Sequence, residues 1–197
     1  GITGHVGVQM NPEVPIRDLV RNIVSDKSSA YTAAQAITAA LFARERGAGG
    51  QHVSVPMLDA SLAFFWSDGM LKHTFLGDDE VPGVPLYELY RIWETADGHI
   101  IYFAATDKEF EGLFRALGHP EWLEDERFAT TEARLVPENR EVLGTLIMNA
   151  LQELPSAVLI ERLSKEGVPV GPVLAPEEIA ADPQVIHNEA ILEFEQP

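Results

Sequence analysis

Residues 28–75 combine two apolar helices with a single strand, and this combination most limits how the chain can fold. In residues 28–46, apolar side chains recur at three- and four-residue spacing, which predicts a helix that buries one mostly alanine face: Ala30, Ala33, Ala34, Ile37, Ala40 and Leu41. Residues 51–57 alternate apolar and polar side chains, which predicts a strand, and residues 59–75 predict a second helix. One strand cannot cover two apolar helices, so we expect its sheet partners to come from elsewhere.

A different pattern begins at residue 87. Two β-like runs flank Ala96, Asp97 and Gly98, which is typical of a hairpin. Thr106 and Glu109 have the spacing of a helix capping box, and further helices are expected at 137–154 and 156–166. A short strand is expected within 168–174. We therefore predict an α/β chain with two parts, residues 1–84 ending in a linker and residues 85–185 forming a small α+β domain with a short antiparallel sheet.

Composition excludes several classes of function. With 14 basic and 31 acidic side chains the net charge is −17, which disfavours binding to nucleic acid or to anionic membranes. There is no cysteine, so disulfides and thiolate metal sites are absent. Nowhere do 18 apolar residues follow one another, so no membrane span is expected. We expect a soluble, cytoplasmic protein.

Most chemistry-bearing residues have an ordinary structural explanation. The six histidines form no His-Glu-x-x-His or His-x-His arrangement, so no metal site is expected. The Gly-rich residues 47–50 lack the Lys-Ser/Thr pair of a phosphate-binding loop, and no Gly-x-Ser-x-Gly turn is present. Asp59 is expected to be an acidic residue at the start of a helix.

Asp26 leaves two interpretations open. It stands just before the helix expected from residue 28, which favours a helix N-cap. The same position suits a catalytic carboxylate, because free backbone N–H groups at a helix start can stabilise developing charge on a bound acyl group. A carboxylate attacking an acyl centre forms a mixed anhydride and so divides one transfer into easier steps. The pattern alone does not choose between the two.

Around this helix the sequence resembles the family III CoA-transferases, also called the CaiB/BaiF family. One group of matches lies within residues 25–64: Asp26, Ala40-Leu41-Phe42-Ala43-Arg44, Gly47-Ala48-Gly49-Gly50-Gln51, Val53-Ser54-Val55 and Leu58-Asp59-Ala60. A second group follows in order along the rest of the chain: Ala96-Asp97-Gly98, Leu117-Gly118-His119-Pro120, Arg134, Gly167-Val168-Pro169, Gly171-Pro172-Val173 and Asp182-Pro183. Gly1-Ile2-Thr3-Gly4 resembles the turn that precedes the catalytic region.

The resemblance implies an acyl-CoA:carboxylate CoA-transferase. Asp26 matches the catalytic aspartate, which becomes an aspartyl-CoA thioester, and Met57 matches a position that can contact CoA. The substrates would be a coenzyme A thioester and a carboxylic acid acceptor, with no tightly bound cofactor, in an interlocked homodimer. The family fold implies that residues 1–84 belong to an incomplete Rossmann-like large domain and that residues 186–197 return towards it. The family's N-terminal Rossmann-like part is not within this sequence.

Two other functions stay open. In an acyl-CoA racemase of the same superfamily, an aspartate at this position acts as an acid or base beside a histidine. The other possibility is a non-catalytic fragment that acts in dimer assembly. One departure from the family pattern is Ala30, which stands where the family often has glycine four residues after the aspartate.

Overall fold

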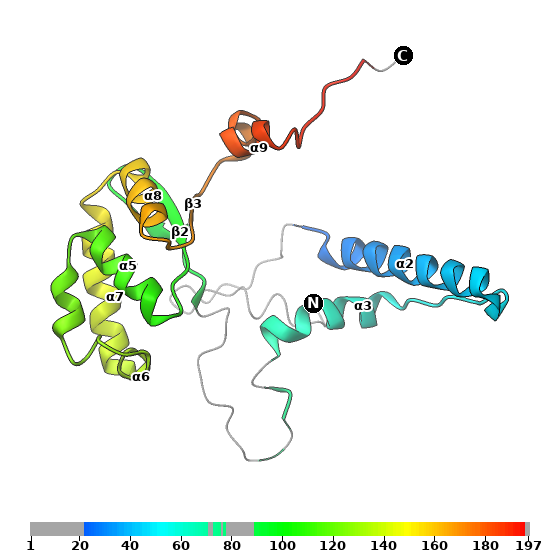
Figure 1. Cartoon of the computed structure of the whole chain (residues 1–197), viewed down its shortest axis with the longest axis horizontal. Coiled ribbons are helices and arrows are strands. Elements are labelled where there is room, and N and C mark those ends of the chain that lie inside the picture. Colours follow the sequence, from blue (N-terminus) through cyan, green and yellow to red (C-terminus); the bar gives the residue numbers. More distant parts are fainter. Residues whose placement is uncertain (1–21, 71–72, 76, 78–88, 196–197) are drawn as a thin grey trace. The chain divides into compact units, whose positions relative to one another are not determined.

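The computed structural model describes residues 22–70, 73–75, 77 and 89–195. The chain divides into two units, Gly1–Leu89 and Tyr90–Pro197, which we describe separately (Figure 1). The turn at residues 1–4 and most of the linker expected at 77–85 lie outside the described residues.

Two packed helices make up the described part of the first unit. Helix α2 (Val24–Ala43) continues into a π-helical turn, η1 (Arg44–Ala48), and helix α3 (Met57–Gly69) returns alongside α2 (Figure 1). Gly47 has a φ of +93°, a conformation that glycine adopts without steric cost, and it ends the helical path at the place where the sequence predicted a stop. Helix α3 ends at Gly69, earlier than residue 75.

Two expectations for this unit were wrong. Residues 49–56 pair with no other described segment and are not a strand, because an extended segment needs a ladder partner to become one. The alanine-rich face of α2 is also not its buried face: Ile37 is 50% and Leu41 46% exposed. The buried residue of α2 is Ser28 instead, and α3 packs against this helix.

A three-stranded antiparallel sheet organises the second unit. Strands β1 (Trp93–Glu94), β2 (His99–Tyr102) and β3 (Val170–Pro172) lie in the order β1-β2-β3. The residues between β1 and β2 are the hairpin turn that the sequence predicted. Along β2, Ile100 and Tyr102 are buried whereas His99 and Ile101 are exposed, the alternation expected when helices cover one face of a sheet.

Three long helices complete this unit. Helix α5 (Asp107–Leu117) begins with the predicted capping box, in which Thr106 and Glu109 exchange hydrogen bonds, and ends at Gly118 in the left-handed conformation. Helix α7 (Pro137–Gln152) begins with proline at its first turn, and α8 (Ser156–Lys165) follows it. The sequence did not predict the short elements η3 (Pro120–Glu124), α6 (Thr131–Leu135) and α9 (Pro183–His187). A further short turn, η4 (Pro176–Ala181), lies between β3 and α9.

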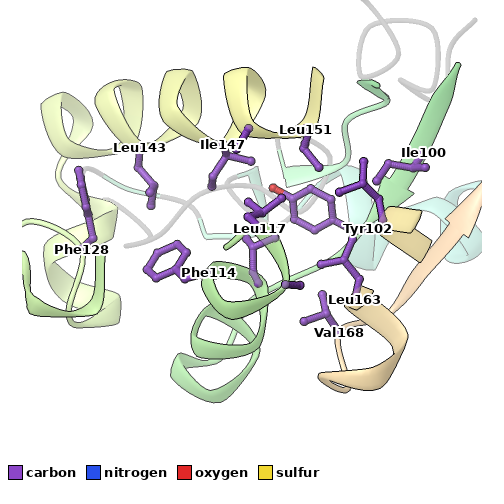
Figure 2. Close-up of a cluster of buried hydrophobic side chains, with 14 residues drawn as sticks. Ile100, Tyr102, Phe114, Leu117, Phe128, Leu143, Ile147, Leu151, Leu163 and Val168 are labelled. Atoms are coloured by element: carbon purple, nitrogen blue, oxygen red, sulfur yellow. The ribbon is translucent and has the colours of Figure 1, made fainter. Parts of the chain in front are cut away.

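The hydrophobic core of the second unit lies between these helices and the sheet. Figure 2 shows Leu143, Ile147 and Leu151 of α7 pointing towards Phe114 and Leu117 of α5, with Ile100 and Tyr102 of β2 beside them. Burial of the Tyr102 ring raises the pKa of its hydroxyl. The mixed helical chain with a small antiparallel sheet agrees with the predicted fold class.

No single helix among the described residues is long and apolar enough to cross a membrane. Helices α7 and α8 reach that length and composition only together, and the chain bends by 119° between them.

Candidate active site

Asp26 is the third residue of α2. Ile23 occupies the N-cap position and provides no side-chain cap, so the N-cap interpretation of Asp26 is wrong. The first turn is nonetheless where a carboxylate complements the unpaired N–H groups and the positive end of the helix dipole. The side chain is exposed and, within the described part of the chain, forms no hydrogen bond. It is therefore accessible for reaction.

The polar neighbours of Asp26 are engaged elsewhere. Ser28 and Ser29 donate their hydroxyls to the carbonyl of Ser25 at 3.2 and 2.7 Å, and Thr32 donates to the carbonyl of Ser28 at 2.8 Å. Lys27 donates to Asn22 Oδ1 at 2.8 Å. These bonds satisfy groups at the start of α2 and leave the Asp26 carboxylate exposed, without a hydrogen-bond partner in the described residues.

Met57 is the first residue of α3. Its side chain is 51% exposed, and its carbonyl accepts a hydrogen bond from Ser61 Oγ at 2.8 Å. Asp26 and Met57 thus lie on two helices that pack against each other, but no interaction joins their side chains in the described residues. A role for Met57 in contacting CoA stays a prediction.

Asp26 also begins one face of α2. In an α-helix, residues four, seven and eleven positions later share a face, and here these are Ala30, Ala33 and Ile37. Ala30 and Ile37 are exposed and Ala33 is half-buried. The candidate nucleophile therefore lies at one end of an apolar face that the described residues leave uncovered.

Two hollows lie along α2, and no sequence pattern indicated either of them. One, of about 580 Å³, is lined by Ala34, Gln35, Thr38, Ala39 and Phe42. The other, of about 310 Å³, lies between the end of α2 and the extended residues after η1; its lining is Ile37, Ala40, Leu41, Arg44, Gly50, Gln51 and Val53. Neither includes Asp26 or Met57, so the hollows do not enclose the candidate nucleophile.

In the described residues, no three His, Asp or Glu side chains gather into a group that could hold a metal ion.

The pKa of the Asp125 carboxyl is lowered, and its neighbours explain why. Arg127 donates from its side chain and its backbone to that carboxylate, and these bonds lower the Asp125 pKa to about 2.

Comparison with known proteins identifies the family. The model of CoA-transferase family III matches residues 2–197. The chain is 31% identical to acetyl-CoA:oxalate CoA-transferase of Acetobacter aceti over 75% of its own length and 38% of that protein. It is 29% identical to succinate–glutarate CoA-transferase of Agrobacterium fabrum over 94% of its own length and 46% of that protein. It thus spans less than half of each of these two relatives.

Solved structures support the same fold. The crystal structure of Rv3272 from M. tuberculosis superposes with a TM-score of 0.80 at 23% identity and covers 98% of this chain and 49% of its own. A CaiB/BaiF family protein from Brucella suis superposes with a TM-score of 0.68 at 26% identity, covering 95% of this chain and 49% of its own. The chain belongs to CoA-transferase family III.

Proposed function

We propose that the chain supplies the nucleophile of an acyl-CoA:carboxylate CoA-transferase and that this nucleophile is Asp26. The observation that carries the proposal is the position of Asp26, an exposed carboxylate in the first turn of α2 with no side-chain partner in the described residues. Membership of the family and relatives named as CoA-transferases for oxalate, succinate and glutarate support this class of reaction.

The proposed reaction needs no oxidant and no cofactor besides CoA. An Asp26 carboxylate oxygen attacks the thioester carbonyl, which forms a mixed anhydride and releases the CoA thiolate. The thiolate attacks the aspartyl carbonyl, giving aspartyl-CoA and the free acid of the donor. The acceptor carboxylate then attacks the aspartyl-CoA carbonyl, which forms a second mixed anhydride and again releases the CoA thiolate. The thiolate attacks the acceptor's acyl carbon in this anhydride, which gives the new acyl-CoA and releases the Asp26 carboxylate. Asp26 is regenerated, so each step exchanges one acyl bond for another.

Chemical trapping tests this assignment. We expect incubation of the protein with an acyl-CoA and hydroxylamine to convert Asp26 to the hydroxamate, since both the anhydride and the thioester react with this amine. Peptide mass spectrometry locates the modification. Asp59 provides a matched control, because it occupies the same third position in α3 and is also exposed.

The two variants should behave differently. Asp59→Asn should retain the label at Asp26, whereas Asp26→Ala should lose both the label and CoA transfer. CoA transfer that continues undiminished in Asp26→Ala would show that another group is the nucleophile.

A further inference from the structure

His119 lies where α5 ends and η3 begins. Gly118 before it has a φ of +86°, and Pro120 after it is the first residue of η3. The backbone N–H of His119 donates to the carbonyl oxygen of Phe114 at 2.8 Å, a group that the end of a helix otherwise leaves without a partner. The backbone therefore fixes the position from which the His119 side chain makes its contacts.

The His119 ring stacks on the Trp122 ring. The ring centres are 4.4 Å apart and the two planes differ by 2°. Trp122 in turn meets Phe114 edge to face, with the ring centres 5.4 Å apart, and Phe114 is fully buried in the core of the second unit (Figure 2). The histidine is thus joined to the core through one indole ring.

Glu121 binds a ring nitrogen of the same histidine. Nδ1 of His119 lies 2.8 Å from Oε1 of Glu121, and 38% of the His119 side chain is exposed, so it can exchange protons with water. This hydrogen bond holds the pKa of the Glu121 carboxyl below its usual range. A neutral imidazole can donate one such bond, whereas an imidazolium is also attracted to the carboxylate charge, to the indole face and to the negative end of α5.

The other charged groups around this junction do not oppose a cation on His119. They lie on α5, on η3 and its C-cap, and at the end of α8: Glu111, Arg115, Glu124, Asp125 and Glu166. Among these residues only Arg115 is a cation, and its guanidinium is bound by Glu166 at 2.7 Å and by Glu111 at 3.6 Å. Glu124 is an exposed carboxylate, and Asp125 is bound to Arg127. A proton on His119 therefore meets mainly attractive charges.

We propose that His119, Glu121 and Trp122, which we call the His119 cluster, attach η3 to α5 in a pH-sensitive manner. The cluster holds η3 firmly when His119 carries a proton and more loosely when the imidazole is neutral. The segment between α5 and α6, which includes the buried Phe128, is therefore held less firmly as the pH rises past neutrality. This device lies within the second unit and does not depend on the proposed role of Asp26.

The ordinary pKa values of the two ionisable side chains define the pH range of the effect. A glutamate carboxyl ionises near about pH 4.3 and a histidine loses its proton near about pH 6.5, so both charges are present between these values. Because the pKa of Glu121 is lowered, its contribution to folding is present above about pH 4.3 and is lost as the pH falls through the folded value. On the alkaline side, loss of the imidazole proton removes the contribution.

Tryptophan fluorescence tests whether the charge on His119 reaches Trp122. A protonated imidazole stacked on an indole quenches its emission, so we expect the emission of the full chain to increase by about 20% or more between about pH 5.5 and about pH 8.0. In His119→Gln the increase should be less than about half as large, because glutamine carries no proton that titrates in this range.

His187→Gln is the matched control for this measurement. His187 is an exposed histidine of the same unit, in the last turn of α9, and its side chain forms no hydrogen bond among the described residues. This variant should follow the emission of the wild type at every pH.

A double-mutant cycle measures the attachment itself. His119→Gln, Glu121→Gln and the double variant are unfolded with urea at about pH 5.5 and about pH 8.0. We expect the coupling of the two side chains to change the unfolding equilibrium constant about threefold at the lower pH and less than about 1.5-fold at the higher pH. Glu121→Gln leaves the histidine in place, so it reports the same pH dependence even if His119→Gln does not fold.

Three outcomes would overturn the proposal. One is a difference in emission between wild type and His119→Gln that is the same at both pH values. Another is a coupling between His119 and Glu121 that does not change with pH. The third is an equal change of emission in His119→Gln and His187→Gln.

Discussion

Gly112 lies within α5 where this helix meets the turn that follows α8. A methyl group there would come within 2.9 Å of the Glu166 carbonyl oxygen and 3.0 Å of Val168 Cγ2, both closer than normal contacts. We expect Gly112→Ala to lower the free energy of unfolding by about 1–3 kcal/mol, because α5 and α8 must separate to accommodate it. Urea denaturation measures the change.

Gly144 in α7 is the matched control for that substitution. A methyl group at Gly144 meets no atom within 4 Å, so Gly144→Ala should gain up to about 1 kcal/mol from helix propensity alone. If the two substitutions change the free energy of unfolding equally, the close approach of Glu166 and Val168 is not the reason why residue 112 must be glycine.

Arg134 belongs to the family pattern, and the structure shows the contacts that its side chain makes. The side chain is 5% exposed, its guanidinium lies 4.1 Å from the centre of the Phe110 ring, and it donates to the Phe128 carbonyl at 2.6 Å. It also pairs with Asp107 at the start of α5, although its buried Nε has no hydrogen-bond partner among the described residues. The family pattern marked this residue, but only the structure shows that it fastens α6 to α5.

At the scale of elements, the β1–β2 turn caps a distant helix. Asp97 Oδ1 accepts a hydrogen bond from the backbone N–H of Ser156 at 2.7 Å, across 59 residues of chain, and Pro155 itself gives α8 no side-chain cap. The Ser156 and Thr95 hydroxyls lie 2.7 Å apart and complete the junction. The hairpin and α8 therefore hold each other in place.

This junction predicts a dependence of stability on pH. The hydrogen bond from the Ser156 backbone, followed by that from its side chain, lowers the Asp97 pKa. A lowered carboxyl pKa stabilises the folded state above the pKa of the unfolded chain, about 3.9, and this stabilisation is lost as the pH falls through the folded pKa. We expect the wild type to melt at higher temperature than Asp97→Asn at pH 7 and at the same temperature in strong acid.

Ser156→Ala separates the charge from the hydroxyl network. It removes the Ser156 hydroxyl, which contacts Thr95 and makes the smaller contribution to the Asp97 pKa, but keeps the backbone N–H that Asp97 accepts from. Most of the pH-dependent difference should therefore persist. If the melting temperatures of wild type and Asp97→Asn instead differ by the same amount at every pH, the carboxylate charge is not the source of the stabilisation.

Elements that depend on adjacent residues could be predicted from the sequence, whereas elements that depend on distant parts of the chain could not. The capping box of α5 and the start of α7 at Pro137 are confirmed because a few adjacent residues determine them. The expected strand at 51–57 and the expected buried face of α2 were wrong because each depends on a neighbour that periodicity does not identify. The elements η3, α6 and α9 were missed because five residues are too few to show a helical period.

At the scale of the whole molecule, the two units differ in how much core they carry. Large apolar side chains such as Phe114, Phe128 and Leu159 are fully buried in the second unit. We therefore expect residues 90–197 expressed alone to unfold cooperatively, with a midpoint close to that of the main transition in the full chain. Calorimetry of both proteins checks this.

Residues 1–89 are the complementary test. In the described part of this unit only Ala60 and Phe65 are buried apolar side chains, so we expect weak chemical-shift dispersion and no cooperative melting from the isolated fragment. A sharp transition from residues 1–89 alone would mean that this unit completes its own core.

The candidate site could be located from the sequence only in part. The pattern left Asp26 open between a helix cap and a catalytic carboxylate, and the family motif was needed to mark the residue as a candidate nucleophile. The helix begins four residues before the expected start, which moves Asp26 from the cap into the first turn. The hollow beside Ile37 and Leu41 was not predictable, because it depends on where the residues after η1 lie against α2.

The pairing of β2 with β3 has a consequence for how the protein is made. Ile101 pairs with Gly171, so β2 leaves the ribosome long before its partner does. Chain synthesis proceeds from the N-terminus, and distant segments meet only after the entropy cost of closing the intervening loop. Helices α5 and α7 can form while the edge of β2 that later pairs with β3 is still unpaired. Closure of the sheet by β3 should then be a late event in folding, and a pause in translation before residue 170 would leave that edge exposed.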